Sequence, residues 1–237
     1  MGGEDEAAMT YDGRIFTPDI PGIQVVPAHP TNVLREVNVP RALVIHTPEE
    51  PADDYESTPI WFQRPNIGGS THYYADNDGD YIQCVPDRFG AIANGLKGKP
   101  RPVWALLVPE PSLNYQTLSI EVEGYAAAMH RTCPPGSRQW MSVRNWIISR
   151  GLVYGIKIDR VHIVGHYELA TDRSDPGTLK LDQLVTEAAE FADLLVRAGA
   201  AAVAHIRLVA ALKPDWDRED FPMLHKKLHY VGVPVAP

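Results

Sequence analysis

One stretch of the chain carries two polar side chains that have the chemistry of metal ligands. An apolar run over residues 161–164 predicts a buried strand, which breaks at Gly165 and is followed at once by His166. A polar loop then leads to Asp175, after which a Pro-Gly pair turns the chain. Histidine nitrogen and aspartate oxygen are both common zinc ligands. The stretch therefore supplies two candidate ligands, and a zinc site needs at least one more.

A second apolar strand also ends in a histidine. Residues 42–45 are apolar and rich in β-branched side chains, and His46 follows them directly. On its own, such a histidine could simply bond a backbone carbonyl at a strand edge. Catalytic zinc sites, however, use three protein ligands and leave a fourth position for water. His46, His166 and Asp175 together therefore form a candidate zinc site.

Two further charged residues could serve chemistry next to such a metal. Glu121 interrupts an apolar strand, where a buried carboxylate lowers stability unless it has a partner, and such a residue is retained where it has a function. It either shares a solvated strand face with Ser119 and Glu123, or faces a cleft as the general base that takes a proton from the attacking water. Arg173 lies in the loop before Asp175, where it could stabilise an oxyanion, hold a substrate carboxylate or simply face solvent.

Other histidines and other catalytic motifs contribute less. We expect His72, beside two tyrosines in a hairpin strand, to line a cleft or support a ligand, and His162 to be structural. The sequence has no Gly-rich phosphate loop, no G-x-S-x-G elbow and no H-E-x-x-H helix. We therefore set aside phosphate binding by a Gly-rich loop, serine hydrolysis at a G-x-S-x-G elbow and metalloprotease chemistry on an H-E-x-x-H helix.

Composition narrows the class of protein. The 237 residues include 44% hydrophobic and 22% charged residues, as expected for one soluble main domain, and the net charge of -8 argues against a nucleic-acid partner. No apolar run is long enough for a membrane span, and the acidic N-terminus lacks the apolar region of a signal peptide, so we expect synthesis in the cytoplasm. Cys84 and Cys133 are expected to be free thiols.

The elements that must position these residues indicate an α/β fold. Residues 1–14 are expected to be disordered, and the helix that begins at residue 181 has a candidate break at Gly199. The predicted strands are 23–26, 42–45, a hairpin of 71–75 and 80–85, 118–122 and 161–164. The predicted helices are 58–64, 137–150 ended by Gly151, and 181–212.

Several motifs occur together in an order that resembles a known family. They are Leu43–Thr47, Trp61–Pro65, Ser70–Tyr73, Asp78–Gly79, Ile82–Pro86, Leu118–Gly124, Gly165–Leu169 and Ser174–Gly177. They resemble the zinc N-acetylmuramoyl-L-alanine amidases of the amidase-2 type, which are related to peptidoglycan recognition proteins. The resemblance extends from about Arg41 to the helix after Leu181.

The resemblance implies a mixed central β-sheet flanked by helices, with zinc (Zn2+) at one end of the sheet. His46, His166 and Asp175 fall on the ligand positions, and Glu121 falls on the catalytic glutamate of the branch that resembles bacterial anhydro-muropeptide amidases. The implied reaction is hydrolysis of the amide between the lactyl group of N-acetylmuramic acid and L-alanine.

The sequence departs from the family at three points. Thr71 replaces the catalytic tyrosine of phage-type relatives, which leaves the role of general base to Glu121. Residues 91–95 lack the substrate-side histidine of many members. The ligand loop is one residue short, so Arg173 matches the transition-state lysine of the glutamate branch only approximately.

We expect a phage-type endolysin that acts on peptidoglycan in the cell wall. The alternatives are a cytosolic amidase that recycles soluble anhydro-muropeptides and a peptidoglycan-binding protein without catalysis. The expected organisation is an N-terminal extended arm over residues 1–40, an amidase catalytic domain over 41–198, and a C-terminal helical extension over 199–237 that packs on the domain.

Overall fold

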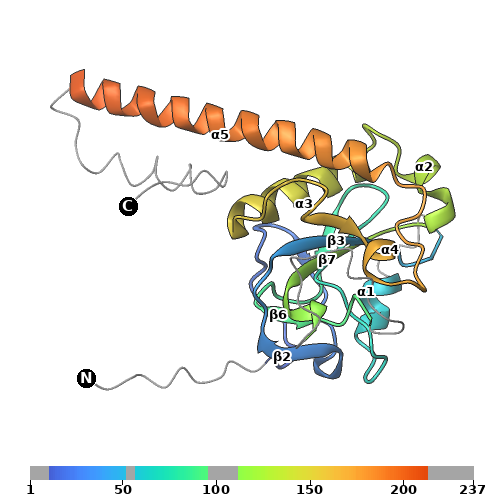
Figure 1. Ribbon diagram of the computed structural model, residues 1–237. Helices are drawn as coiled ribbons and strands as arrows, with labels where there is room; N and C mark the ends of the chain where they lie inside the picture. Colours follow the sequence, from blue (N-terminus) through green and yellow to red (C-terminus); the bar gives the residue numbers. More distant parts are fainter. Residues whose placement is uncertain (1–10, 52–56, 96–111, 213–237) are drawn as a thin grey trace, which may run out of the picture.

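A six-stranded mixed sheet with helices packed on it forms the centre of the molecule (Figure 1). The computed structural model describes residues 11–51, 57–95 and 112–212, the last twelve of these as backbone only. The strands are β1 Gln24–Val25, β2 Val33–Val37, β3 Ala42–His46, β4 Tyr73–Ala75, β5 Tyr81–Gln83, β6 Phe89–Ala91, β7 Thr117–Val122 and β8 Ile163–Gly165. The helices are α1 Ser57–Phe62, α2 Met129–Thr132, α3 Arg138–Tyr154, α4 His166–Leu169 and α5 Leu181–Leu212. The predicted fold class is confirmed.

The parallel core of the sheet brings distant parts of the chain to one edge. The strand order is β1-β5-β4-β7-β3-β8, and β3 pairs in parallel with both β7 and β8. The register places His46 beside Glu121 at the ends of β3 and β7. Because β8 ends one residue before His166, all three side chains leave the sheet at the same edge. The predicted hairpin is also confirmed, with β4 and β5 antiparallel.

The two faces of β3 and β7 have different surroundings. One face carries Leu43, Ile45, Leu118 and Ile120, which pack against α3 and α5 in the largest core cluster. We call this the helix-side face. The opposite face carries Ala42 and Val44, which pack on Leu113, Val164 and Leu169, and it ends in the polar pair His46 and Glu121. We call this the cleft-side face.

Helix α3 is longer than the sequence predicts. The side chain of Ser137 caps its N-terminus by accepting the Trp140 N–H at 3.1 Å, and Gly155 ends it with a φ of 64°. The predicted end at Gly151 is wrong, because this glycine lies inside the helix. A Cβ at Gly151 would lie 2.9 Å from a side-chain carbon of Ile158, so close packing explains the glycine there.

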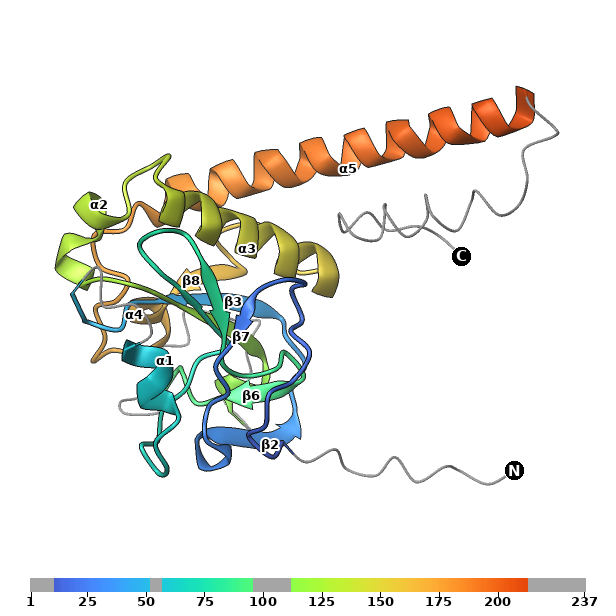
Figure 2. The same ribbon diagram turned by 180° about the vertical axis from the view of Figure 1, so that it is seen from behind.

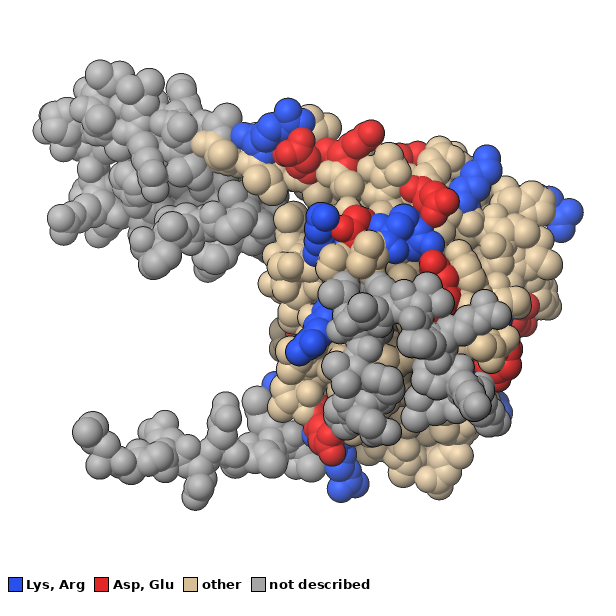
Figure 3. Space-filling view, in the orientation of Figure 1, with Lys and Arg blue, Asp and Glu red and all other residues tan. Residues whose placement is uncertain are grey.

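Helix α5 is continuous, so the predicted break at Gly199 is wrong. Its first three turns pack on the helix-side core through Leu184, Val185 and Ala188, and its later part projects beyond α3 (Figures 1 and 2). The exposed side carries mixed charges, including the Arg197–Asp193 ion pair at 2.6 Å, and Figure 3 shows acidic and basic residues interspersed there. The predicted extension beyond residue 212 lies outside the described residues, as do residues 96–111.

The described part of the N-terminal arm contributes strands to both sheets. Strand β1 adds to the central sheet beside β5, as predicted for residues 23–26, and β2 pairs with β6 in a second sheet. Tyr11 is buried and its hydroxyl donates to the Ala28 carbonyl at 2.7 Å, so the prediction of disorder through residue 14 is wrong at Tyr11.

Both cysteines are free and buried. Among the described residues, no helix combines the length and apolar character that a membrane crossing requires.

Candidate metal centre

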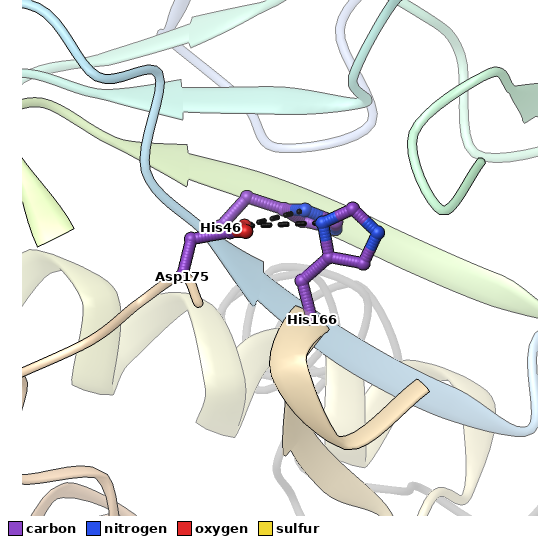
Figure 4. Close-up of side chains that lie close together, drawn as sticks. All are labelled: His46, His166 and Asp175. Atoms are coloured by element: carbon purple, nitrogen blue, oxygen red, sulfur yellow. Dashed lines mark hydrogen bonds and ion pairs between the residues drawn. The ribbon is translucent and has the colours of Figure 1, made fainter. Parts of the chain in front are cut away.

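Three side chains from separate elements converge at the edge of the sheet (Figure 4). Oδ2 of Asp175 lies 3.3 Å from Nδ1 of His46 and 3.1 Å from Nδ1 of His166. The two imidazole rings are 4.4 Å apart between centroids, and one nitrogen or oxygen from each of the three residues lies within 4.8 Å of the others. The three residues predicted from the sequence as ligands are thus brought together, in a donor set of two nitrogens and one oxygen that could hold a metal ion.

The segment that carries His166 begins as a helical turn. The sequence predicts a polar loop after Gly165, but α4 forms instead, and this part of the prediction is wrong. The Glu168 carboxylate stabilises the turn by accepting the Gly165 N–H and an Arg160 guanidinium N–H, both at 2.8 Å. A Cβ at Gly165 would lie 2.6 Å from the ring of Pro176, so only glycine allows this close approach. The Tyr167 N–H, which donates to the Asp175 carbonyl at 2.9 Å, ties the returning loop to α4.

A backbone carbonyl orients the His166 ring. Nε2 of His166 lies 3.0 Å from the carbonyl oxygen of Asn94, which can only accept a hydrogen bond. The proton therefore belongs on Nε2, and Nδ1 keeps its lone pair toward Asp175 and a metal. Asn94 is held in turn by its side-chain amide, which donates to the Thr117 hydroxyl at 2.8 Å. Residue type gave no signal for Asn94, because its backbone makes the contact.

Burial favours the protonation states that a metal site needs. The pKa of His46 is lowered to about 4, first by burial and then by the nearby His166 ring, so His46 is neutral near pH 7. Burial would raise the pKa of Asp175, but the adjacent His166 and His46 rings bring it below its ordinary value. A neutral imidazole and an ionised carboxylate are the forms that bind a metal.

Glu121 faces the cleft, so the alternative of a solvated strand face is wrong. Its neighbours on that face, Ser119 and Glu123, are buried. Within the described part of the chain, Oε2 of Glu121 is shielded and has no hydrogen-bond partner. Burial raises the pKa of Glu121 well above its ordinary value, and the carboxylates of Asp175 and Glu50 add to the effect. A carboxylate with a raised pKa is a stronger proton acceptor.

These residues line a cleft of about 710 Å³, within the range of small-molecule sites. Arg173 lies exposed in the cleft wall, near enough that a Cβ at Gly95 would be 3.8 Å from its Nη2. The described lining residues are His46, Thr47, Pro48, Glu49, Glu50, Ser57, Thr58, Trp61, Phe62, Arg64, Ile67, Gly68, Gly69, Ser70, Ile92, Ala93, Gly95, Glu121, His166, Arg173 and Asp175.

The remaining histidines discussed above have structural contacts. Nδ1 of His72 accepts the Ser119 N–H at 3.1 Å, and Nε2 lies 2.9 Å from the Phe89 carbonyl, so His72 links two sheets. It is not among the residues that line the cleft, and the prediction of a cleft-lining role is wrong. Nδ1 of His162 lies 2.6 Å from Asp159, in agreement with a structural role.

Comparison with known proteins identifies relatives of this chain. A family model described as N-acetylmuramoyl-L-alanine amidase matches residues 36–178. No curated protein matches the sequence.

Solved structures share the fold at low sequence identity. A mutant endolysin from Bacillus subtilis is 14% identical, with 70% of this chain and 97% of that chain covered and a TM-score of 0.52. The catalytic domain of XlyA is 12% identical, with coverages of 71% and 99% and a TM-score of 0.52. A selenomethionine derivative of AmpD is 16% identical, with coverages of 76% and 98% and a TM-score of 0.49.

Proposed function

The chain belongs to the N-acetylmuramoyl-L-alanine amidase family and acts as a peptidoglycan amidase, and from this premise we propose that its metal centre is a zinc site formed by His46, His166 and Asp175. The observation that carries the proposal is the convergence of the three side chains, with both Nδ1 atoms within 3.3 Å of one carboxylate oxygen. Three protein ligands of these types leave one position of a tetrahedral site open.

The donor set and its surroundings fit zinc. Neutral imidazoles and a carboxylate are ligands of catalytic zinc, and the Asn94 carbonyl gives His166 the tautomer that such a site requires. When bound, zinc lowers the pKa of a water towards ~7 and polarises a carbonyl oxygen.

We assign the proton transfers to Glu121. As general base, its carboxylate takes a proton from the attacking water while the water oxygen bonds to the carbonyl carbon of the lactyl group. The protonated Glu121 then gives this proton to the L-alanine nitrogen as the C–N bond breaks. The raised pKa of Glu121 and its position beside His46 support both steps, because the group must accept and then release the same proton.

Arg173 is proposed to stabilise charge on the substrate. Its side chain lines the same cleft as the three ligands and partly offsets the rise in the pKa of Glu121, so its charge acts across the site. A guanidinium there would stabilise the negative charge that develops on the carbonyl oxygen.

We propose that the biological role is that of a phage-type endolysin that acts on the cell wall. A mutant endolysin shares the fold at a TM-score of 0.52, which supports this assignment. The second candidate, recycling of soluble anhydro-muropeptides, is supported by Glu121, because the resemblance places it on the catalytic glutamate of that branch. The complete ligand set and Glu121 disfavour a binding protein without catalysis.

Digestion of two substrates separates the two roles. The zinc-loaded protein is incubated with purified sacculi and, separately, with soluble anhydro-muropeptides, and new L-alanine amino termini are counted. An endolysin cleaves the sacculi at least as fast as the soluble substrate, whereas a recycling enzyme cleaves only the soluble one. If neither digest gives new L-alanine amino termini, the proposed reaction is contradicted. It is also contradicted if Glu121→Gln releases these termini as fast as the wild type.

A further inference from the structure

Helix α1 presents an exposed tryptophan to the cleft. The Trp61 side chain lines the cleft and is 43% exposed, whereas the next residue, Phe62, is only 4% exposed and belongs to a hydrophobic core. Large aromatic side chains that remain exposed in a concave site are frequent contact points for ligands, since they bury much apolar area when covered. Nothing in the proposed amide hydrolysis uses Trp61.

One buried side chain fixes the position of this tryptophan. The amide nitrogen of Asn32 donates to the carbonyls of Phe62 at 3.0 Å and Arg64 at 2.7 Å. Its amide oxygen accepts the N–H of Ile67 at 3.1 Å and of Gly68 at 3.3 Å. Asn32 therefore holds both the end of α1 and the loop that follows it, so Trp61 is presented from a supported backbone.

Small and polar residues line the same described cleft as the Trp61 ring. A Cβ placed on Gly69 would lie 3.6 Å from the ring, so this neighbour presents backbone only. Ser57 and Thr58 of α1 also line the cleft, and their hydroxyls donate to Glu50. The cleft thus combines the flat aromatic surface of Trp61 with hydrogen-bonding groups in the same lining.

We propose that Trp61 is the platform on which a sugar ring of the glycan stacks. This inference rests on the proposed function, because the glycan is then joined through its lactyl group to the amide that is cut. A pyranose ring has a flat face of C–H groups with hydroxyl and acetamido groups at its rim, which matches a cleft lined by both Trp61 and polar side chains. An alanine methyl or a charged stem-peptide side chain offers no such face.

The dimensions of the cleft allow both contacts at once. Trp61, His46 and Glu121 line the same cleft of about 710 Å³, which is large enough for a sugar and the start of a peptide. A sugar ring on Trp61 and an amide at His46 and Glu121 would therefore occupy one continuous cleft. Trp61 would thus contribute to substrate binding, with no role in the bond-breaking step.

Three variants and two matched substrates test the proposal. Trp61→Ala removes the platform, Trp61→Phe keeps an aromatic face, and Ile60→Ala is the control, because Ile60 is 47% exposed on α1 but does not line the cleft. The substrates are a soluble disaccharide-peptide and a lactoyl-peptide with the same amide but no sugar. For the disaccharide-peptide, Trp61→Ala should raise KM about tenfold, the factor for ~1.4 kcal/mol, and leave kcat within about twofold.

On the sugar-free substrate, Trp61→Ala should match the wild type. On the disaccharide-peptide, Trp61→Phe should retain most of the wild-type affinity. An equal rise in KM on both substrates would overturn the proposal and assign Trp61 to the peptide, and an unchanged KM on both would also overturn it. Wild-type inactivity on both substrates would instead contradict the proposed function. NMR measures binding of the peptide-free disaccharide, with zinc content and thermal unfolding as controls. This binding must weaken in Trp61→Ala whether or not the wild type cleaves the two substrates.

Discussion

The helix-side face of β3 and β7 is packed with apolar side chains, whereas the cleft-side face of the same two strands ends in polar side chains of the candidate site. On the helix-side face, Ile45 and Ile120 are fully buried against α3 and α5. On the cleft-side face, the neighbouring residues His46 and Glu121 carry polar atoms that have no protein hydrogen-bond partner among the described residues. Because side chains alternate along a strand, the packed face holds the backbone that places the reactive face.

This difference indicates that stability and activity should respond to different substitutions. An apolar core residue contributes through burial, and its loss leaves a cavity. A buried carboxylate without a partner costs stability and is retained where chemistry needs it. A substitution on the helix-side face should therefore change mainly the unfolding free energy, and one at the neighbouring catalytic position on the cleft-side face should change mainly the catalytic rate.

The largest expected effect is on catalysis at the cleft-side face. Glu121→Gln removes the proposed proton acceptor and should lower kcat by about 10²–10⁴-fold, the usual contribution of a general base. The unfolding free energy in urea should stay equal or increase, because a buried ionisable group is replaced by a neutral one. A variant that retains wild-type kcat on muropeptides would show that Glu121 is not the base.

The next largest effect is on stability at the helix-side face. Ile120→Ala should lower the unfolding free energy by about 2–5 kcal/mol through the cavity it leaves. Its matched control is Ser119→Ala, the adjacent residue on the opposite face, whose buried hydroxyl has no partner among the described residues and whose loss should cost far less. Equal destabilisation of the two variants in urea would contradict the division between faces.

A pH effect of intermediate size is expected from His72, which lies enclosed between the sheets. Burial lowers its pKa to about 4, compared with about 6.5 in an unfolded chain. The unfolded state therefore binds more protons between these values, so stability is complete above pH 6.5 and decreases as pH falls towards 4. The loss should reach about 3 kcal/mol at 1.36 kcal/mol per pKa unit.

NMR titration of the His72 ring, together with urea unfolding of the zinc-free protein at several pH values, measures this effect. His72→Gln should flatten the pH dependence. A ring that titrates near pH 6.5 in the folded protein would contradict the enclosed position of His72 between the two sheets.

The smallest expected effect comes from Thr117, at the start of β7. Its hydroxyl accepts from the Asn94 amide at 2.8 Å and donates to the Leu113 carbonyl at 3.0 Å. Thr117→Val should cost about 1 kcal/mol, as expected for a buried hydrogen bond. Because Asn94 orients His166, zinc affinity should also fall, and a zinc titration that matches the wild type would separate Thr117 from the metal centre.

The sequence predicts the strands and the candidate ligands because each depends on local patterns, whereas the sheet class and the convergence of the ligands follow from the resemblance to one family. Apolar runs that end in His46 or precede His166 can be read directly along the chain. The motif order then relates these strand ends to one family. Residue type and order are sufficient for this part of the site.

The features that the sequence does not predict depend on contacts between distant segments. Asn94 orients His166 through a backbone carbonyl, which is the same for every residue type. Gly151 has the properties of a helix end and is instead required by the side chain of Ile158. Tyr11, the first residue that the structure describes, is fixed by a hydrogen bond to Ala28, which the local composition does not reveal.

The metal content of three proteins tests whether His46, His166 and Asp175 hold zinc while Glu121 transfers protons beside it. Wild type, Glu121→Gln and His166→Ala are stripped, reloaded with one equivalent of zinc, dialysed and assayed by elemental analysis, with circular dichroism as a check of folding. We expect one zinc per chain in wild type and Glu121→Gln, and none in His166→Ala. One zinc retained by folded His166→Ala at wild-type affinity, or zinc lost from Glu121→Gln, would contradict it.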